Sequence, residues 1–110
     1  MINNVILVGR LTADPEVKEV GESKVINFTL AVPRTYKNED GEYEADFINC
    51  NIWDKGADIM REHCKKGDIV GVKGSLMSSV YEKDDVKHYK LDVRCDRLSL
   101  LNPKKVEVTE

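Results

Sequence analysis

Asp46-Phe47-Ile48-Asn49-Cys50-Asn51-Ile52-Trp53 is the stretch of this chain whose pattern decides most about its fold. Side chains of a β-strand point alternately to opposite faces of the sheet. One face of this stretch is apolar and is predicted to enter a hydrophobic core; it carries Ile48, Cys50 and Ile52. The other face combines two aromatic rings with two amides, on Phe47, Asn49, Asn51 and Trp53. The stretch is therefore predicted to be a half-buried strand.

Four further strands and one helix are predicted around this stretch from alternation and turn residues. The strands are expected over residues 4–11, 24–33, 46–53, 68–76 and 88–101, and the helix over 56–66. Asp40-Gly41 is predicted to form a hairpin turn, because both turn positions tolerate positive φ. Gly67 is predicted to cap the helix, and Pro33 to lie at a strand end or edge. Residues 81–87 are predicted to form a solvated hairpin loop.

These elements indicate an all-β fold with one short helix. Five antiparallel strands with a helix between the third and fourth match the OB-fold, a five-stranded, partly open Greek-key β-barrel. A small β-sandwich is the alternative, and the position of the single helix favours the barrel. We expect one domain over residues 1–101, followed by a short, flexible C-terminal extension over 102–110.

The charge of the chain is unevenly distributed. The net charge is −3, from 17 basic and 20 acidic residues. Residues 35–46 alone have a balance of −4, because one lysine stands against five acidic side chains, so the rest of the chain is at +1. The acidity is thus predicted to sit in one hairpin, which leaves room for a basic groove elsewhere.

Several classes of protein are disfavoured by what the sequence lacks. The first residues carry no charged leader, and the early apolar run over residues 5–8 is too short for export or for a membrane span, so a cytoplasmic protein is expected. Three widely spaced cysteines do not indicate a disulfide framework or a zinc knuckle. Cys64 follows His63, which suggests either a metal ligand or a small buried helix residue, and the second interpretation is favoured.

An enzyme is not expected. Asp84 and Asp85 are candidate metal ligands, and His63 and His88 are candidate bases. No nucleophile–base arrangement, phosphate loop or metal-ligand spacing accompanies them. The sequence therefore predicts a protein without catalytic residues, metal or cofactor.

The polar face of the 46–53 strand suggests a binding function. Phe47 and Trp53 on an outward face suit stacking against nucleobases, and such stacking tolerates any sequence because every base has a π-face. The same pattern also fits rings that pack under a loop, against the helix or in a subunit interface. Tyr36 and Tyr81 stand at the bases of the two predicted hairpins. Basic residues that could follow a phosphate backbone are Arg10, Arg34, Lys37, Lys55, Lys73 and Arg94.

Several spaced segments resemble the single-stranded-DNA-binding proteins of bacteria and phages. They are Met1-Ile2-Asn3-Asn4-Val5-Ile6-Leu7-Val8-Gly9-Arg10-Leu11 with Asp14-Pro15-Glu16, Asn27-Phe28-Thr29-Leu30-Ala31-Val32, Ala45 to Trp53, and Lys65-Lys66-Gly67 running into Gly71-Val72-Lys73-Gly74. The resemblance covers residues 1–101 in register. It implies an OB-fold that assembles as a homotetramer and wraps single-stranded DNA in replication, recombination and repair.

The resemblance also implies roles for individual residues. Stacking positions of the family correspond to Trp53, Phe47, Tyr36 and Tyr81, and its phosphate-binding positions to Arg10, Arg34, Lys55 and Lys73. The protein is then expected in the bacterial cytoplasm, at the nucleoid or as a phage-encoded protein acting there.

The chain departs from the family pattern in its charges and its end. Asn4 stands where a basic residue is common, Ser75-Leu76-Met77-Ser78-Ser79 lacks arginines, and the hairpin is unusually acidic. The family's flexible tail and acidic terminal tip are missing, so docking of replication and repair proteins through such a tip is not expected. An OB-fold primosomal accessory module with weak DNA binding is the alternative function.

Overall fold

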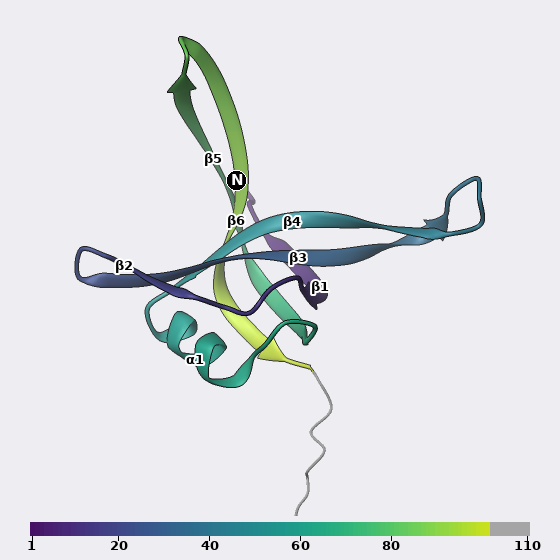
Figure 1. The fold of residues 1–110 in the computed structure, drawn as a ribbon, viewed down its shortest axis with the longest axis horizontal. Coiled ribbons are helices and arrows are strands. Elements are labelled where there is room, and N and C mark those ends of the chain that lie inside the picture. The colour runs from purple at the N-terminus through teal and green to yellow at the C-terminus, as the bar shows by residue number, and fades with distance from the viewer. Residues whose placement is uncertain (102–110) are drawn as a thin grey trace, which may run out of the picture.

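The computed structural model describes residues 1–101, as six strands and one helix (Figure 1). The elements in chain order are β1 (Val5–Leu11), β2 (Val17–Val20), β3 (Ser23–Lys37), β4 (Tyr43–Trp53), α1 (Lys55–His63), β5 (Ile69–Lys83) and β6 (Val86–Leu100). The predicted extension over 102–110 lies outside the described residues. Within residues 1–101, no helix is both long and apolar enough to span a bilayer.

The strands close into a ring. The sheet order is β1-β5-β6-β4-β3-β2, and β1 also pairs with β3, so five strands enclose a barrel with β2 as an outer neighbour of β3. All pairs are antiparallel except β4 with β6, which run parallel from Cys50 opposite Val93 to Ile52 opposite Cys95. The all-β fold with one helix between the third and fourth ring strands is as predicted, in the arrangement of an OB-type barrel.

The core fills this ring and is closed at one end by α1. Ile26 and Leu30 of β3 and Met60 of α1 are fully buried. Ala57 and Met60, three residues apart, lie on the inward face of the helix. The predicted core positions on β4 are confirmed in Cys50 and Ile52, which are buried.

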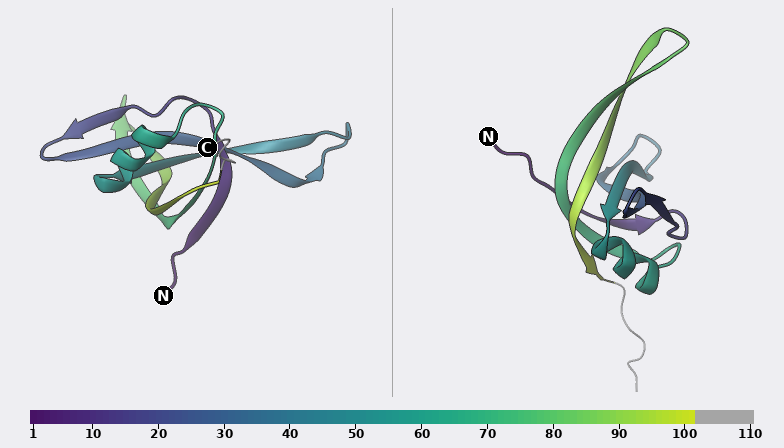
Figure 2. Two further views of the ribbon diagram at one scale, coloured as in Figure 1. Left: turned by 90° about the horizontal axis from the view of Figure 1, so that it is seen from below. Right: turned by 90° about the vertical axis from the view of Figure 1, so that its left-hand side faces the viewer.

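Two long hairpins continue beyond the barrel as arms. β3 and β4 form one arm and β5 and β6 the other, and they leave the barrel in different directions (Figures 1 and 2). The strands predicted over residues 24–33, 46–53, 68–76 and 88–101 are therefore too short at the ends that form the arms. Residues 81–87 are not a loop, since β5 and β6 pair up to Lys83 opposite Val86. The turn needs only Asp84 and Asp85, which both adopt positive φ (54° and 65°), as a tight two-residue turn requires.

The β3–β4 turn lies where it is predicted but has a different geometry. Only Gly41 has positive φ (77°), and Asp40 does not. The N–H of Gly41 donates to the carbonyl of Asn38 at 3.0 Å. The Asn38 Oδ1 accepts hydrogen bonds from the N–H groups of Asp40 and Glu42, each at 2.9 Å. The hydrogen bonds between the Asn38 side chain and the backbone of its own turn thus hold the turn without a second residue at positive φ.

Three local predictions are corrected or refined. α1 ends at His63 with Cys64 extended, so Gly67 does not cap it; Gly67 (φ 92°) instead turns the chain toward β5, and its N–H donates to the carbonyl of Leu11 at 2.9 Å. β2 was not predicted, because its four residues are too few to show a period. Pro33 lies within β3 and not at its end. It pairs with β4 on one side and lies beyond the last β3 residue that pairs with β1, so its predicted position at a sheet edge is confirmed.

Candidate nucleic-acid interface

The outward face of β4 carries the most exposed part of the candidate site. Phe47 lies opposite Ala31 of β3, and its ring is 68% exposed because the neighbour on that strand is only a methyl group. The predicted alternation is confirmed, since the odd-numbered side chains of this stretch point away from the buried Cys50 and Ile52. An exposed ring beside a small residue leaves one aromatic face open to a flat ligand.

Trp53 lies at the other end of the same strand face and is held more firmly. Its indole Nε1 donates a hydrogen bond to Asn51 Oδ1 at 3.0 Å. The guanidinium of Arg94, on the neighbouring β6, lies over the indole with its Cζ 5.3 Å from the ring centroid. Asn51 and Arg94 are register partners in the parallel pair, which explains why all three side chains meet. The half-buried indole therefore keeps a fixed orientation.

The amide oxygens between the two rings are already engaged. Asn51 Oδ1 accepts from Trp53, and Asn49 Oδ1 accepts from the hydroxyl of Thr29 on β3 at 3.2 Å. An acceptor committed to an intramolecular hydrogen bond is less available to read the edge of a base. The face therefore presents aromatic surface beside amides that are partly engaged within the protein.

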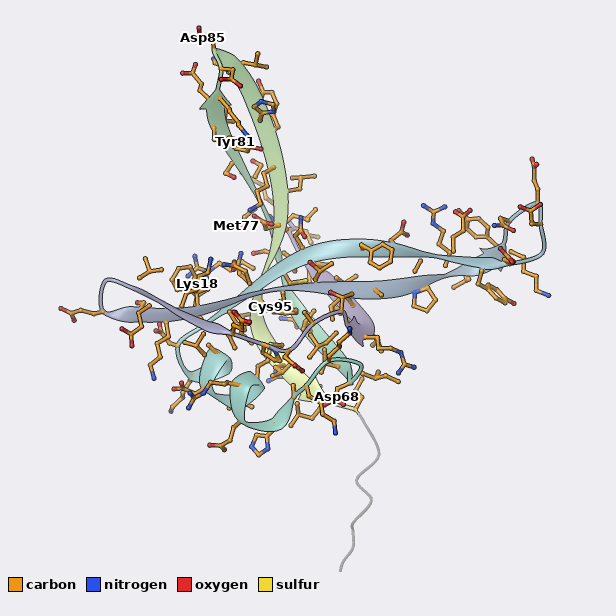
Figure 3. All side chains as sticks on the ribbon, in the orientation of Figure 1. Lys18, Asp68, Met77, Tyr81, Asp85 and Cys95 are labelled. Atoms are coloured by element: carbon orange, nitrogen blue, oxygen red, sulfur yellow. The ribbon has the colours of Figure 1, made fainter. Side chains whose placement is uncertain are left out.

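The same outward face continues along the β5–β6 arm. Tyr81 lies opposite His88, and their rings stack with centroids 5.1 Å apart and planes inclined by 17°. Met77 and Tyr81 follow one another up β5 toward the turn at Asp85 (Figure 3). Alternation along β6 places His88 on the same side as Arg94, and hence on the side of Trp53. Tyr81 thus extends the surface that begins on β4.

Tyr36 occupies the other arm. It lies in β3 within the irregular stretch between Pro33 and Lys37, and it is 64% exposed. Nearby, the ammonium of Lys37 lies 5.7 Å from the ring centroid of Tyr43. The four predicted stacking residues are therefore all at least partly exposed, with two on the barrel strand β4 and one on each arm.

The predicted phosphate contacts fall in different places. Lys55 begins α1 and helps to line a cavity of about 390 Å³ next to Trp53, together with Arg94, Arg97, Gly56 and Ile59. Arg10 on β1 donates from Nη1 to the carbonyl of Gly67 at 2.9 Å. Lys73 lies on β5 between Ile6 and Arg97, two strands from β4. The structure thus brings Lys55 close to Trp53 and leaves Arg10 and Lys73 on other parts of the wall.

Arg34 is engaged by two carboxylates of the same arm. Its Nη2 lies 2.8 Å from Asp46 Oδ1, and its Nη1 lies 3.2 Å from Glu44 Oε1. The hydrogen bond from Arg34 lowers the pKa of the Asp46 carboxyl. The hydrogen bonds to Asp46 and the negative charge of Asp46, together with other nearby groups, raise the pKa of Arg34. The guanidinium is therefore always charged.

The family of the chain is decided by a match that covers most of its sequence. The model of the "Single-strand binding protein family" matches residues 2–101, which include all the described strands and the helix. This chain belongs to that family. The resemblance stated above is confirmed, and the expectation of a non-enzymatic DNA-binding protein is confirmed with it.

Single-strand binding relatives from three bacteria illustrate the match. A single-stranded DNA-binding protein of Enterococcus faecalis is 46% identical over 103 residues, covering 92% of this chain and 55% of the relative. Single-stranded DNA-binding protein B of Bacillus subtilis is 42% identical over 106 residues, 94% of either chain. Single-stranded DNA-binding protein 1 of Staphylococcus aureus is 43% identical over 109 residues, 97% of this chain and 65% of the relative. The chain thus spans about half the length of the first relative and nearly all of the second.

The structure adds cations to the candidate site that the sequence alone does not single out. In the sequence, Arg94 is only one of several strand cations, and nothing singles out Arg97 or Lys90. Their proximity to β4 depends on the parallel β4–β6 pair, which joins residues about 43 positions apart in the chain. The spacing of Arg94 and Arg97 gives no local signal of that pairing.

The residues considered and disfavoured as metal ligands are not brought together in a cluster among residues 1–101. No group of three or more potential metal ligands occurs in this described part of the chain. Cys64 is half-buried, and burial raises the pKa of its thiol. Cys50 and Cys95 are buried in the core, where their thiols lie close enough to raise the pKa of Cys50 through a mutual hydrogen bond.

Proposed function

We propose that this protein coats single-stranded DNA without sequence preference. The observation that carries the proposal is the outward face of β4, where an exposed Phe47 and a braced Trp53 flank amides whose oxygens are already bonded. Each stacked base contributes about 1–3 kcal/mol whatever its identity. The two rings are six residues apart on one strand, roughly 20 Å at strand rise, so they engage different nucleotides.

The arms extend this surface in two directions. A strand of DNA that leaves Trp53 along β5 and β6 meets Arg94 and then Tyr81. On the β3–β4 arm, Arg34 and Tyr36 offer further contacts on the side opposite Phe47. Cations at Lys55 and Arg97 border the cavity beside Trp53 and supply phosphate contacts. Arg10 and Lys73 complete the phosphate path where the DNA passes round the barrel.

We further propose a homotetramer acting in the bacterial cytoplasm in replication, recombination and repair. β1 supports self-assembly, because along residues 5–9 one of its edges has no strand partner among the described residues. Ile6 and Val8 are exposed on the same strand. An open edge with apolar neighbours is a common means of strand pairing between subunits. Sedimentation velocity of the protein and of an Ile6→Lys variant tests whether this strand is used.

A primosomal accessory module with weak DNA binding is the second candidate. The acidic β3–β4 arm favours it, because its arginine is already paired with Asp46 and Glu44. Retained binding to a helicase or helicase loader without binding to oligo-dT would support this candidate.

Titration of the single tryptophan with oligo-dT tests the proposed function directly. Quenching of Trp53 fluorescence by oligo-dT, and not by a duplex of equal length, is the expected result. Absence of quenching together with absence of binding by fluorescence anisotropy of labelled oligo-dT would contradict it.

A further inference from the structure

The β3–β4 arm contains an ion-pair cluster whose geometry is better defined than that of ordinary surface charges. Arg34 Nε lies 3.2 Å from each carboxylate oxygen of Asp46, and Nη2 lies 2.8 Å from Oδ1. Arg34 Nη1 bonds Glu44 Oε1 at 3.2 Å. The other carboxylate oxygen of Glu44 accepts from Asn38 Nδ2 at 3.2 Å. Both acidic groups are thus oriented toward one guanidinium.

The local register explains why these groups meet. Pro33 pairs with Ala45 and Lys37 with Tyr43, so three residues of β3 stand opposite one residue of β4. The extra length places Arg34 beside Glu44 and Asp46, which share one face of the partner strand. Two negative charges therefore face one positive charge, and the cluster has a net charge of −1.

The cluster lies in water, and its contribution to stability is small. The side chains of Arg34, Glu44 and Asp46 are 38%, 52% and 50% exposed. Exposed ion pairs typically stabilise a fold by only about 0–1 kcal/mol. An exposed bidentate pair can exchange one anion for another, and a phosphate offers the guanidinium the same two-oxygen geometry as a carboxylate.

The position of the cluster connects it with the proposed DNA path. Strand alternation places Asp46 and Glu44 on the side of the arm opposite Phe47, and Tyr36, two residues beyond Arg34, lies on the side of the cluster. A strand of DNA that stacks on Tyr36 must therefore carry a phosphate past these carboxylates. Lys37, the other cation of this arm, already lies against Tyr43.

We propose that Asp46 and Glu44 form an acidic clamp, which holds Arg34 in the free protein and must be displaced by a DNA phosphate. This inference rests on the proposed function and assigns these carboxylates the role of tuning it. When Arg34 moves to a phosphate, the cation released from the DNA is offset by cations that gather at the two freed carboxylates, so the net counterion release is small. The freed carboxylates then repel the phosphate that replaced them. The clamp thereby lowers both the affinity of the β3–β4 arm for DNA and the dependence of that affinity on salt.

The test compares two doubly neutralised variants of the same hairpin. Asp46→Asn with Glu44→Gln releases Arg34, whereas Glu39→Gln with Asp40→Asn removes the same charge from the turn. Affinity for oligo-dT is measured by Trp53 quenching at several salt concentrations. The clamp variant is expected to bind several-fold more tightly at low salt, with a slope of log K against log salt that is steeper by about 0.7. The turn variant is expected to keep the wild-type slope.

A third substitution, Arg34→Gln, tests whether the gain depends on the arginine. Added to the clamp variant, it should remove the gain in affinity and slope, because the released arginine is the group that takes up the phosphate. Circular dichroism of each variant confirms folding. Equal slopes for the clamp and turn variants, with normal binding by the wild-type protein, would overturn the clamp alone. Failure of the wild-type protein to bind oligo-dT would overturn the proposed function, and the clamp with it.

Discussion

Removal of the Phe47 ring should separate DNA binding from stability. The ring is 68% exposed, so only about a third of it is buried, and full burial of such a side chain contributes about 1.5–3 kcal/mol. Phe47→Ala should therefore reduce the free energy of unfolding by less than about 1 kcal/mol. Loss of one stacked base should weaken DNA binding by about 1–3 kcal/mol, or roughly 5- to 150-fold in Kd. Trp53 remains in this variant and reports binding to oligo-dT by its fluorescence.

Tyr89→Ala provides the matched control. Tyr89 is 76% exposed on the β5–β6 arm, but strand alternation places it on the opposite face from Tyr81 and His88. Its loss should leave the Kd for oligo-dT within about twofold, with the oligomeric state checked by sedimentation velocity. If folded Phe47→Ala binds as tightly as Tyr89→Ala, the stacking assignment of β4 is refuted and the ring serves assembly instead.

Three further outcomes are expected. Gly74→Ala should destabilise the barrel strongly in urea unfolding, because the new Cβ would overlap the Arg94 carbonyl oxygen, whereas Gly71→Ala meets only the end of a leucine side chain and should be tolerated. Asp84→Asn with Asp85→Gly should increase amide protection along the β5–β6 arm, since relief of positive φ at a non-glycine residue gains about 1 kcal/mol. The wild-type protein should show a slope of log K against log salt no steeper than about −3, as expected for roughly four phosphate contacts, and titrations at several salt concentrations measure it.

The barrel was largely predictable because its signals are local. Alternation along residues 46–53 placed Cys50 and Ile52 in the core and Phe47 outside, and the structure agrees. The arms were underestimated because their strands are exposed on both faces, so polar residues such as Ser78 and Glu82 do not alternate with apolar ones. Hydrogen bonding to the partner strand, which leaves no hydrophobic period, is what makes them strands.

The candidate site was only half predictable, because its electrostatics depend on contacts between strands. The aromatic positions follow from the alternation of β4 and from the resemblance to the family. The sequence does not show which cations are free to bind a phosphate. In the structure Arg34 is bound by carboxylates and Arg10 by a carbonyl, while Arg94 lies on the indole of Trp53. Each of these partners is distant in the sequence or shifted by an irregular register.

The engaged state of these cations indicates how the protein binds DNA with a net charge of −3. Lys24 is paired with Asp58 at 3.0 Å and Lys90 with Asp92 at 3.7 Å, so the pairing of cations extends beyond Arg34. A phosphate that recruits such a cation must first displace its partner, which reduces the electrostatic gain. The rings carry no such cost, because Phe47 and Tyr36 are already exposed to water and gain contact area when a base covers them. We therefore expect stacking to be the main source of affinity in this chain and the charges mainly to set its dependence on salt.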